Sequence, residues 1–221
     1  MNLTVVIPAL DAAATIGETL GTICGLAEVI VVDGGSRDAT KDIAVRHGAR
    51  PIDSKRGRGC QLAAGAGAAA GEWLLFLHAD TRLEAGWGAV VASFMESPRS
   101  KACAATFRFK LDDDCWQASS LQRLVGWRAR VLGLPYGDQG LLIHRDFYAA
   151  IGGYPDWPLM EDVELVRKIG RNRLVTLRAS AVTSATRWKK EGWLARSLRN
   201  SLCLSLFYMG VSPRLIARLY G

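Results

Sequence analysis

Short apolar runs alternate with segments of helical spacing along the first half of the chain. Runs without polar breaks, rich in β-branched residues, predict buried strands at 3–7, 29–32, 49–52, 73–77 and 102–109. Apolar residues at helical spacing predict intervening helices at 15–24, 36–46, 60–70 and 87–95. Parallel strands need long crossovers, which such helices supply. The pattern therefore predicts an α/β fold with a mostly parallel central sheet flanked by helices.

The alternation is less regular after residue 110. A long helix is predicted from Asp112 to Leu132, followed by a strand at 141–144, a helix at 161–169 and a strand at 173–177. No low-complexity linker interrupts this part of the chain. We therefore expect one domain over residues 1–192 and an apolar, basic helical tail over 193–221, packed on the domain, on a second copy or on a membrane.

Composition narrows the class of protein. The 221 residues are 49% hydrophobic and 22% charged, which is typical of a folded globular chain and excludes a disordered one. The net charge of +7 favours anionic partners, and we expect nucleotides or a membrane surface rather than nucleic acid. Five cysteines without a close pair indicate neither a zinc site nor a disulfide framework. They favour a cytoplasmic location, with the inner face of the membrane as the alternative.

Carboxylates stand where predicted strands end. Asp33 follows the run 29–32, Asp80 follows the run beginning at Trp73, and Glu161 and Asp162 open a predicted helix. A buried carboxylate is costly without a partner, so packing alone does not explain these positions. The carboxyl ends of strands in an open α/β sheet form the ligand crevice. The placement predicts a site for a metal-bound phosphate ligand.

Four motifs in this order carry a resemblance to a known family. They are Val5–Asp11, Val31–Thr40, Leu77–Asp80 and Glu161–Leu165. With them the sequence resembles, over residues 3–192, a family 2 glycosyltransferase with the GT-A fold. Tyr136–Gly140 and Ser184–Trp188 resemble a small bacterial branch of that family, whose acceptors are unassigned. The resemblance implies inverting transfer of a sugar from a nucleoside diphosphate sugar to an acceptor hydroxyl, assisted by Mg²⁺ or Mn²⁺.

The resemblance also implies a nucleotide-binding side. Pro8, Leu10 and Asp11 would curve around the base, although an ordinary turn explains them too. The family usually has Asn where Asp11 stands. Asp33 would accept a hydrogen bond from the base, with Gly35 allowing close backbone approach. Arg58 would neutralise the diphosphate; its alternative is a solvated surface loop.

His78, Ala79 and Asp80 occupy the place of the family's Asp-x-Asp motif. Asp80 is the predicted metal ligand, because Mg²⁺ and Mn²⁺ prefer oxygen. His78 faces the same side of an extended segment. It would favour Mn²⁺ or contact the nucleotide together with Ala79, and a structural histidine is the alternative.

The acceptor side follows from the later motifs. By the resemblance, Asp162 is the general base and Glu161 supports it, whereas helix N-terminal acids stabilised by the dipole are the alternative. A second set of residues would bind acceptor hydroxyls or the diphosphate. The alternative is a plain turn for the pair at 138–139 and a surface basic cluster for the pair at 187–188. The members of the set are Asp138, Gln139, Arg187 and Trp188.

Two other functions stay open. A sugar-1-phosphate nucleotidyltransferase would carry a Gly-rich, Lys-containing loop after the first strand, which residues 9–13 do not provide. A non-catalytic, membrane-peripheral nucleotide-binding protein is kept open by His78 and Ala12. The tail joins arginines to Trp193 and Phe207, which suits an interfacial helix on anionic lipid. A helix docked on the domain or a homodimer surface suits it equally.

Overall fold

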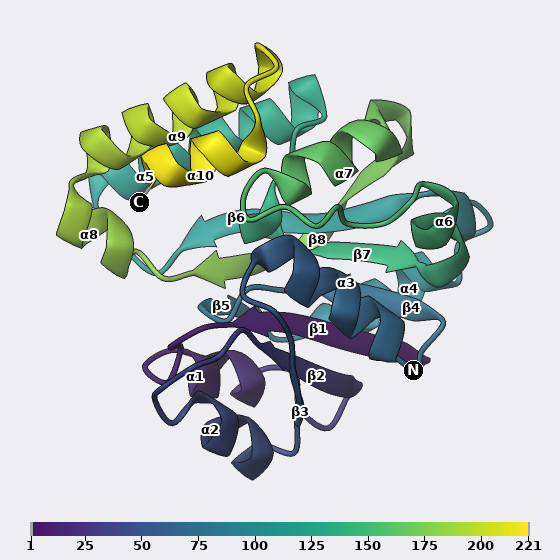
Figure 1. The fold of residues 1–221 in the computed structure, drawn as a ribbon. Helices are drawn as coiled ribbons and strands as arrows, with labels where there is room; N and C mark the ends of the chain where they lie inside the picture. The colour runs from purple at the N-terminus through teal and green to yellow at the C-terminus, as the bar shows by residue number, and fades with distance from the viewer. Residues whose placement is uncertain (1, 221) are drawn as a thin grey trace.

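The centre of the molecule is an eight-stranded mixed sheet (Figure 1). The computed structural model describes residues 2–220. The strands are β1 Leu3–Ala9, β2 Glu28–Asp33, β3 Arg50–Asp53, β4 Trp73–Phe76, β5 Thr81–Leu83, β6 Ala104–Leu111, β7 Leu141–His144 and β8 Leu174–Thr183. Their order in the sheet is β3-β2-β1-β4-β7-β6-β8-β5. The predicted α/β class is confirmed.

Parallel pairing joins β3, β2, β1 and β4, so the carboxyl ends of these four strands meet at one edge. The register places Ala9 of β1 beside Asp33 of β2. Strand β7 runs antiparallel to both β4 and β6, while β8 pairs parallel with β6 and antiparallel with β5. The edge that carries Asp33 and leads to Asp80 is therefore built by the parallel half of the sheet.

Helices cover both faces of this sheet. They are α1 Ile16–Gly21, α2 Thr40–Arg46, α3 Arg58–Ala68, α4 Trp87–Met95, α5 Trp116–Trp127, α6 Arg145–Ala150, α7 Glu161–Ile169, α8 Thr186–Glu191, α9 Trp193–Tyr208 and α10 Pro213–Tyr220. Val5 of β1 packs in a core with α1, α2 and α4, whereas its neighbour Val6 packs on the other face with α3, α6 and α7. This alternation is the two-residue period of a strand buried on both sides.

Several elements were not predicted from the pattern. Strand β5 has only three residues, and α6 and α8 have six each, too short for a clear period. The predicted strand at 173–177 extends to Thr183, because β8 pairs with both β6 and β5. The helix predicted from Asp112 begins at Trp116 and becomes a π-helical turn at Arg128–Leu132.

The segment predicted as a tail folds into α9 and α10, which lie at the same end of the molecule as α7 (Figure 1). Cys203 of α9 and Ile216 of α10 form a buried cluster with Met160 and Val163. Met1 and Gly221, the outer ends of the two predicted segments, lie outside the described residues. Within residues 2–220, none of the helices combines the length and apolar character needed to cross a membrane.

Close packing of α3 on the sheet gives the first testable prediction. A Cβ at Gly65 would lie 2.3 Å from Val6 Cγ1 and 2.8 Å from Val32 Cγ2, whereas one at Gly67 meets nothing within 4 Å. We expect Gly65→Ala to destabilise the fold by about 1–3 kcal/mol through overpacking. Gly67→Ala, the matched control, should be neutral or stabilise it by up to about 1 kcal/mol through helix propensity. Urea unfolding measures both, and equal effects would contradict the packing described.

Candidate active site

Asp33 is a buried carboxylate in which one oxygen accepts hydrogen bonds from the backbone and the other accepts none within residues 2–220. It ends β2 and is 1% exposed. Its Oδ2 accepts hydrogen bonds from the backbone N–H groups of Gly35, at 3.0 Å, and Ser36, at 2.9 Å. Its Oδ1 is buried and has no hydrogen-bond partner among residues 2–220. Such an orphaned acceptor is costly unless a ligand N–H meets it.

The loops that follow β1 and β2 are bonded to each other beside Asp33. The Asp11 backbone N–H donates to Ser36 Oγ at 2.9 Å, and Arg37 N–H donates to Asp11 Oδ1 at 2.8 Å. Asp11 has a positive φ of 47°, and Pro8 lies within β1. These contacts fix the shape of the loop predicted to surround the base, and Leu10 is half-buried in it.

Gln61 is a site residue that the sequence did not reveal. Its buried Nε2 donates to the carbonyls of Ala9 and Val32, both at 2.8 Å, and so ties together the ends of β1 and β2. Gln61 lies three residues after Arg58 on α3, so the two side chains are neighbours on one helix face. The sequence feature that could have pointed to Gln61 is its polar amide side chain among the small residues of this helix.

Arg58 is the centre of the charged cluster. Its Nε lies 3.1 Å from Glu161 Oε1, and its Nη2 contacts His78 Nε2. Desolvation would lower the pKa of Arg58, but nearby carboxylates raise it above its ordinary value; they belong to Glu161, Asp162, Asp138 and Asp80. Arg128 is a second cation near Asp138 and Asp162, so two guanidinium groups share the charge of these four acids.

His78 is held by protein groups on both ring nitrogens. Nδ1 lies 3.3 Å from Asp138 Oδ1, and Nε2 faces Arg58. Burial would raise the pKa of Asp138, but the hydrogen bond from His78 and the charges of Arg58 and Arg128 lower it to about 2. A Cβ at Gly137 would lie 2.5 Å from His78 Nε2, so a side chain at this position would displace the imidazole from its present place. The role predicted for His78 toward a nucleotide or a metal stays a prediction.

Glu161 and Asp162 have different surroundings at the start of α7. Glu161 is fully buried, and desolvation raises its pKa although Arg58 opposes the shift. Asp162 is partly exposed; its Oδ2 accepts from Gly137 N–H at 2.8 Å and its Oδ1 from Val163 N–H at 2.8 Å. Asp162 is therefore the member of the pair that a bound molecule can reach.

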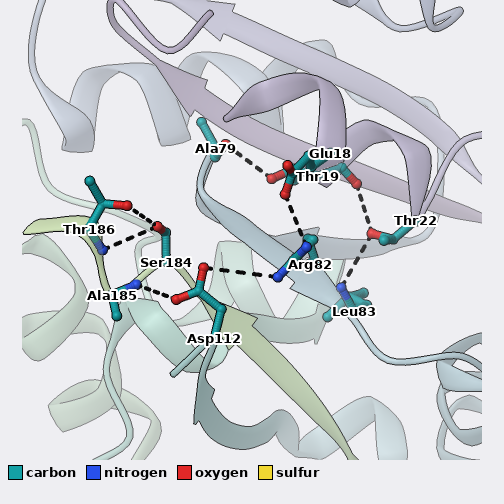
Figure 2. Close-up of polar contacts among 10 residues, drawn as sticks. All are labelled: Glu18, Thr19, Thr22, Ala79, Arg82, Leu83, Asp112, Ser184, Ala185 and Thr186. Atoms are coloured by element: carbon teal, nitrogen blue, oxygen red, sulfur yellow. Dashed lines mark hydrogen bonds and ion pairs between the residues drawn. The ribbon is translucent and has the colours of Figure 1, made fainter. Parts of the chain in front are cut away.

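A polar hollow of about 190 Å³ lies beside Asp80. Figure 2 shows Arg82 between Glu18 and Asp112. Arg82 Nη1 lies 3.0 Å from Glu18 Oε2, and Arg82 Nη2 lies 4.0 Å from Asp112 Oδ2. Thr19 Oγ1 donates to the carbonyl of Ala79 at 3.0 Å, and the Asp80 carbonyl accepts from Ser184 N–H at 3.0 Å. The hollow joins α1, the turn at Asp80 and the end of β8. Neither Arg82 nor Asp112 was singled out from the sequence, because neither stands in a motif.

The remaining candidates for the acceptor side are Gln139, Arg187 and Trp188, and none of them lines the hollow beside Asp80. Gln139 is buried and donates to the Phe107 carbonyl at 3.1 Å. Trp188 is buried among residues of α5 and β6 and stacks on Trp193. Arg187 is exposed on α8. Among residues 2–220, neither Arg187 nor Trp188 has a hydrogen bond or ion pair to the Arg58 cluster, so the roles predicted for them stay predictions.

The family model for glycosyl transferase family 2 matches residues 4–148. The chain belongs to glycosyl transferase family 2. The match contains Asp33, Arg58, His78, Asp80 and Asp138. It ends before α7, so the family model does not include Glu161 and Asp162, which are candidates from the sequence motif and the structure alone.

A curated relative is similar in sequence, and solved structures share the fold. A PGL/p-HBAD biosynthesis glycosyltransferase of Mycobacterium tuberculosis is 41% identical over 103 residues, a match that spans 41% of this chain and 40% of the relative. S. aureus TarS, solved with UDP-GlcNAc, has a TM-score of 0.65 at 18% identity over 83% of this chain and 58% of that chain. GalNAc-T7, solved with UDP, GalNAc and Mn²⁺, has a TM-score of 0.62 at 15% identity over 82% and 43%. The shared fold is GT-A.

Burial of Glu161 gives a prediction about pH. Since the folded-state pKa is raised, the wild-type protein loses stability as pH rises through the titration of this carboxyl, whereas Glu161→Gln has no such loss. We expect the melting temperature of Glu161→Gln, relative to wild type, to increase between pH 4.5 and pH 8. Exposed Glu96→Gln is the matched control and should show no such trend. A pH-independent difference for Glu161→Gln would contradict the assignment.

Proposed function

We propose that this protein transfers a glycosyl group from a nucleoside diphosphate sugar to an acceptor hydroxyl, with inversion at the anomeric carbon. The observation that carries the proposal is the gathering of Arg58, His78, Asp138, Glu161 and Asp162 at the sheet edge in a family 2 chain. This edge is the ligand crevice of an open α/β sheet.

The donor's base is assigned to Asp33. Its free Oδ1 is an acceptor without a protein partner among the described residues, so it suits a ring N–H. Gly35, with a φ of 97°, holds the backbone of this turn in a left-handed conformation beside it. TarS was solved with UDP-GlcNAc and GalNAc-T7 with UDP, which supports a uridine nucleotide as the first donor class to test.

A divalent metal fits the residues at Asp80. Residues 2–220 contain no group of three or more His, Cys, Asp or Glu side chains that holds a metal alone. Mg²⁺ commonly binds through one or two carboxylates plus substrate phosphates, and Asp80 supplies one carboxylate. When bound, the metal would neutralise charge on the departing diphosphate. GalNAc-T7 was solved with Mn²⁺, which supports the assignment.

The acceptor's proton is assigned to Asp162. Each of its oxygens accepts one backbone hydrogen bond and keeps a further lone pair for an acceptor hydroxyl. These two bonds fix the carboxylate, and fixed geometry is what general base catalysis requires. Arg58 keeps its positive charge and so stabilises the negative charge that develops near the diphosphate. Glu161 acts through Arg58 as a positioning residue.

Replacement of Asp162, the proposed general base, tests this proposal. We expect Asp162→Asn to lower the release of nucleoside diphosphate from a panel of nucleotide sugars, water acting as acceptor, by about 10²–10⁴-fold. The thermal shift that these nucleotide sugars produce with Mn²⁺ should be retained, because the proposal gives Asp162 no contact with the nucleotide base or the diphosphate. Mass spectrometry identifies the products.

Asp42→Asn, on the exposed face of α2, is the control and should keep full turnover. Unchanged turnover of Asp162→Asn would exclude the general-base role. Release of pyrophosphate from a nucleoside triphosphate and a sugar-1-phosphate would instead identify a nucleotidyltransferase.

A further inference from the structure

Exposed large apolar side chains are concentrated on three helices. Residues 2–220 contain 15 of them, and 12 lie within α5, α9, α10 and the turns that directly follow α5 and α9. The 12 are Trp116, Leu124, Trp127, Val131, Leu132, Leu194, Leu198, Leu202, Tyr208, Met209, Leu215 and Leu219. The other three, Leu26, Val45 and Val175, are separate. Scattered exposure is normal, whereas this concentration marks an interaction surface.

The exposed side chains follow helical spacing. Leu194, Leu198 and Leu202 recur every four residues on α9, and Leu215 and Leu219 do so on α10. Each helix buries a different side, since Cys203 and Ile216 pack with Met160 and Val163 at the start of α7. Both helices are thus amphipathic with a second, unpartnered apolar stripe.

The helices α5 and α9 lie side by side. Leu121 of α5 and Trp193 of α9 pack in one cluster around Trp188. Figure 1 shows α5 behind α9, with α10 in front, along the same end of the molecule. We call these three helices, with the turn 128–132, the helical face.

The charge of the helical face has one sign. Residues 115–137 and 192–220 contain arginines and no aspartate or glutamate. Four of these arginines are exposed and have no ion pair within residues 2–220, namely Arg123, Arg130, Arg214 and Arg218. The acids that flank these segments are Asp114, Asp138 and Glu191. Asp138 faces His78, and Glu191 already pairs with Arg196 and Arg199.

We propose that the helical face docks on the surface of an anionic lipid bilayer. Apolar stripes rimmed by arginine, with two exposed tryptophans, have the chemistry of helices that lie in the membrane interface. Tryptophan suits that boundary because its ring is apolar and its N–H is polar. Each arginine near an anionic surface adds electrostatic attraction.

The same charge argues against a second copy as the occupant. A two-fold interface would place the arginines of one helical face against the same arginines of the other, and the face offers no carboxylate to pair with them. Like charges brought together in an interface are unfavourable. A polyanionic surface matches the face, and its own copy does not.

Vesicle co-sedimentation of the full chain tests the proposal. We expect binding to vesicles of phosphatidylcholine with phosphatidylglycerol and at least about 10-fold weaker binding to phosphatidylcholine alone. Leu194→Gln/Leu198→Gln should weaken binding by at least about 10-fold. The control Leu26→Gln/Val45→Gln removes exposed apolar side chains outside the helical face and should bind as wild type.

A second pair of variants isolates charge. Arg214→Gln/Arg218→Gln should weaken binding to the anionic vesicles by roughly 30-fold, while the exposed pair Arg46→Gln/Arg99→Gln should not. The proposal is overturned by absence of binding to either vesicle, or by equal losses in the helical-face and control variants. A dimer in analytical ultracentrifugation that Leu194→Gln/Leu198→Gln abolishes would also overturn it, since the face would then bind its own copy.

Discussion

The pairing of Arg58 with Glu161 is the interaction on which the rest of the site depends. Glu161 is fully buried at the start of α7, and Arg58 is the only cation in the described chain that lies within ion-pair distance of it. A buried carboxylate without its partner costs several kcal/mol, so α3 and α7 must begin beside one another. That requirement brings together segments that are about a hundred residues apart in sequence.

The two halves of the molecule are then fixed around this pair by different means. On the side proposed to bind the nucleotide, parallel pairing sets the strand ends at one edge, and Gln61 ties the ends of β1 and β2 one helical turn from Arg58. On the side proposed to bind the acceptor, Gly137 donates to Asp162 and approaches His78, while α9 and α10 pack against the start of α7. The reactive groups are thus held by packing on rigid elements, which suits catalysis by pre-organised charge.

The sequence predicted the parts that follow local rules. Apolar runs located six of the eight strands closely. Acids at the ends of runs singled out Asp33 and Asp80, and acids at a predicted helix start singled out Glu161 and Asp162; their roles stay predictions. It did not predict β5, α6 or α8, which are too short for a period and form only by pairing or packing with distant residues. Nor did it predict that His78 contacts Asp138 and Arg58, since these partners lie 60 and 20 residues away and only the tertiary fold joins them.

A double-mutant cycle on Arg58→Met and Glu161→Gln, by urea unfolding at pH 8, tests this dependence most directly. Each single variant leaves one charged group without its partner, whereas the double variant leaves neither. We expect the double variant to be less destabilised than the sum of the singles, with a coupling energy of about 1–3 kcal/mol. Additivity to within about 0.5 kcal/mol would contradict the view that this pair holds the two helix starts, and with them the site, together.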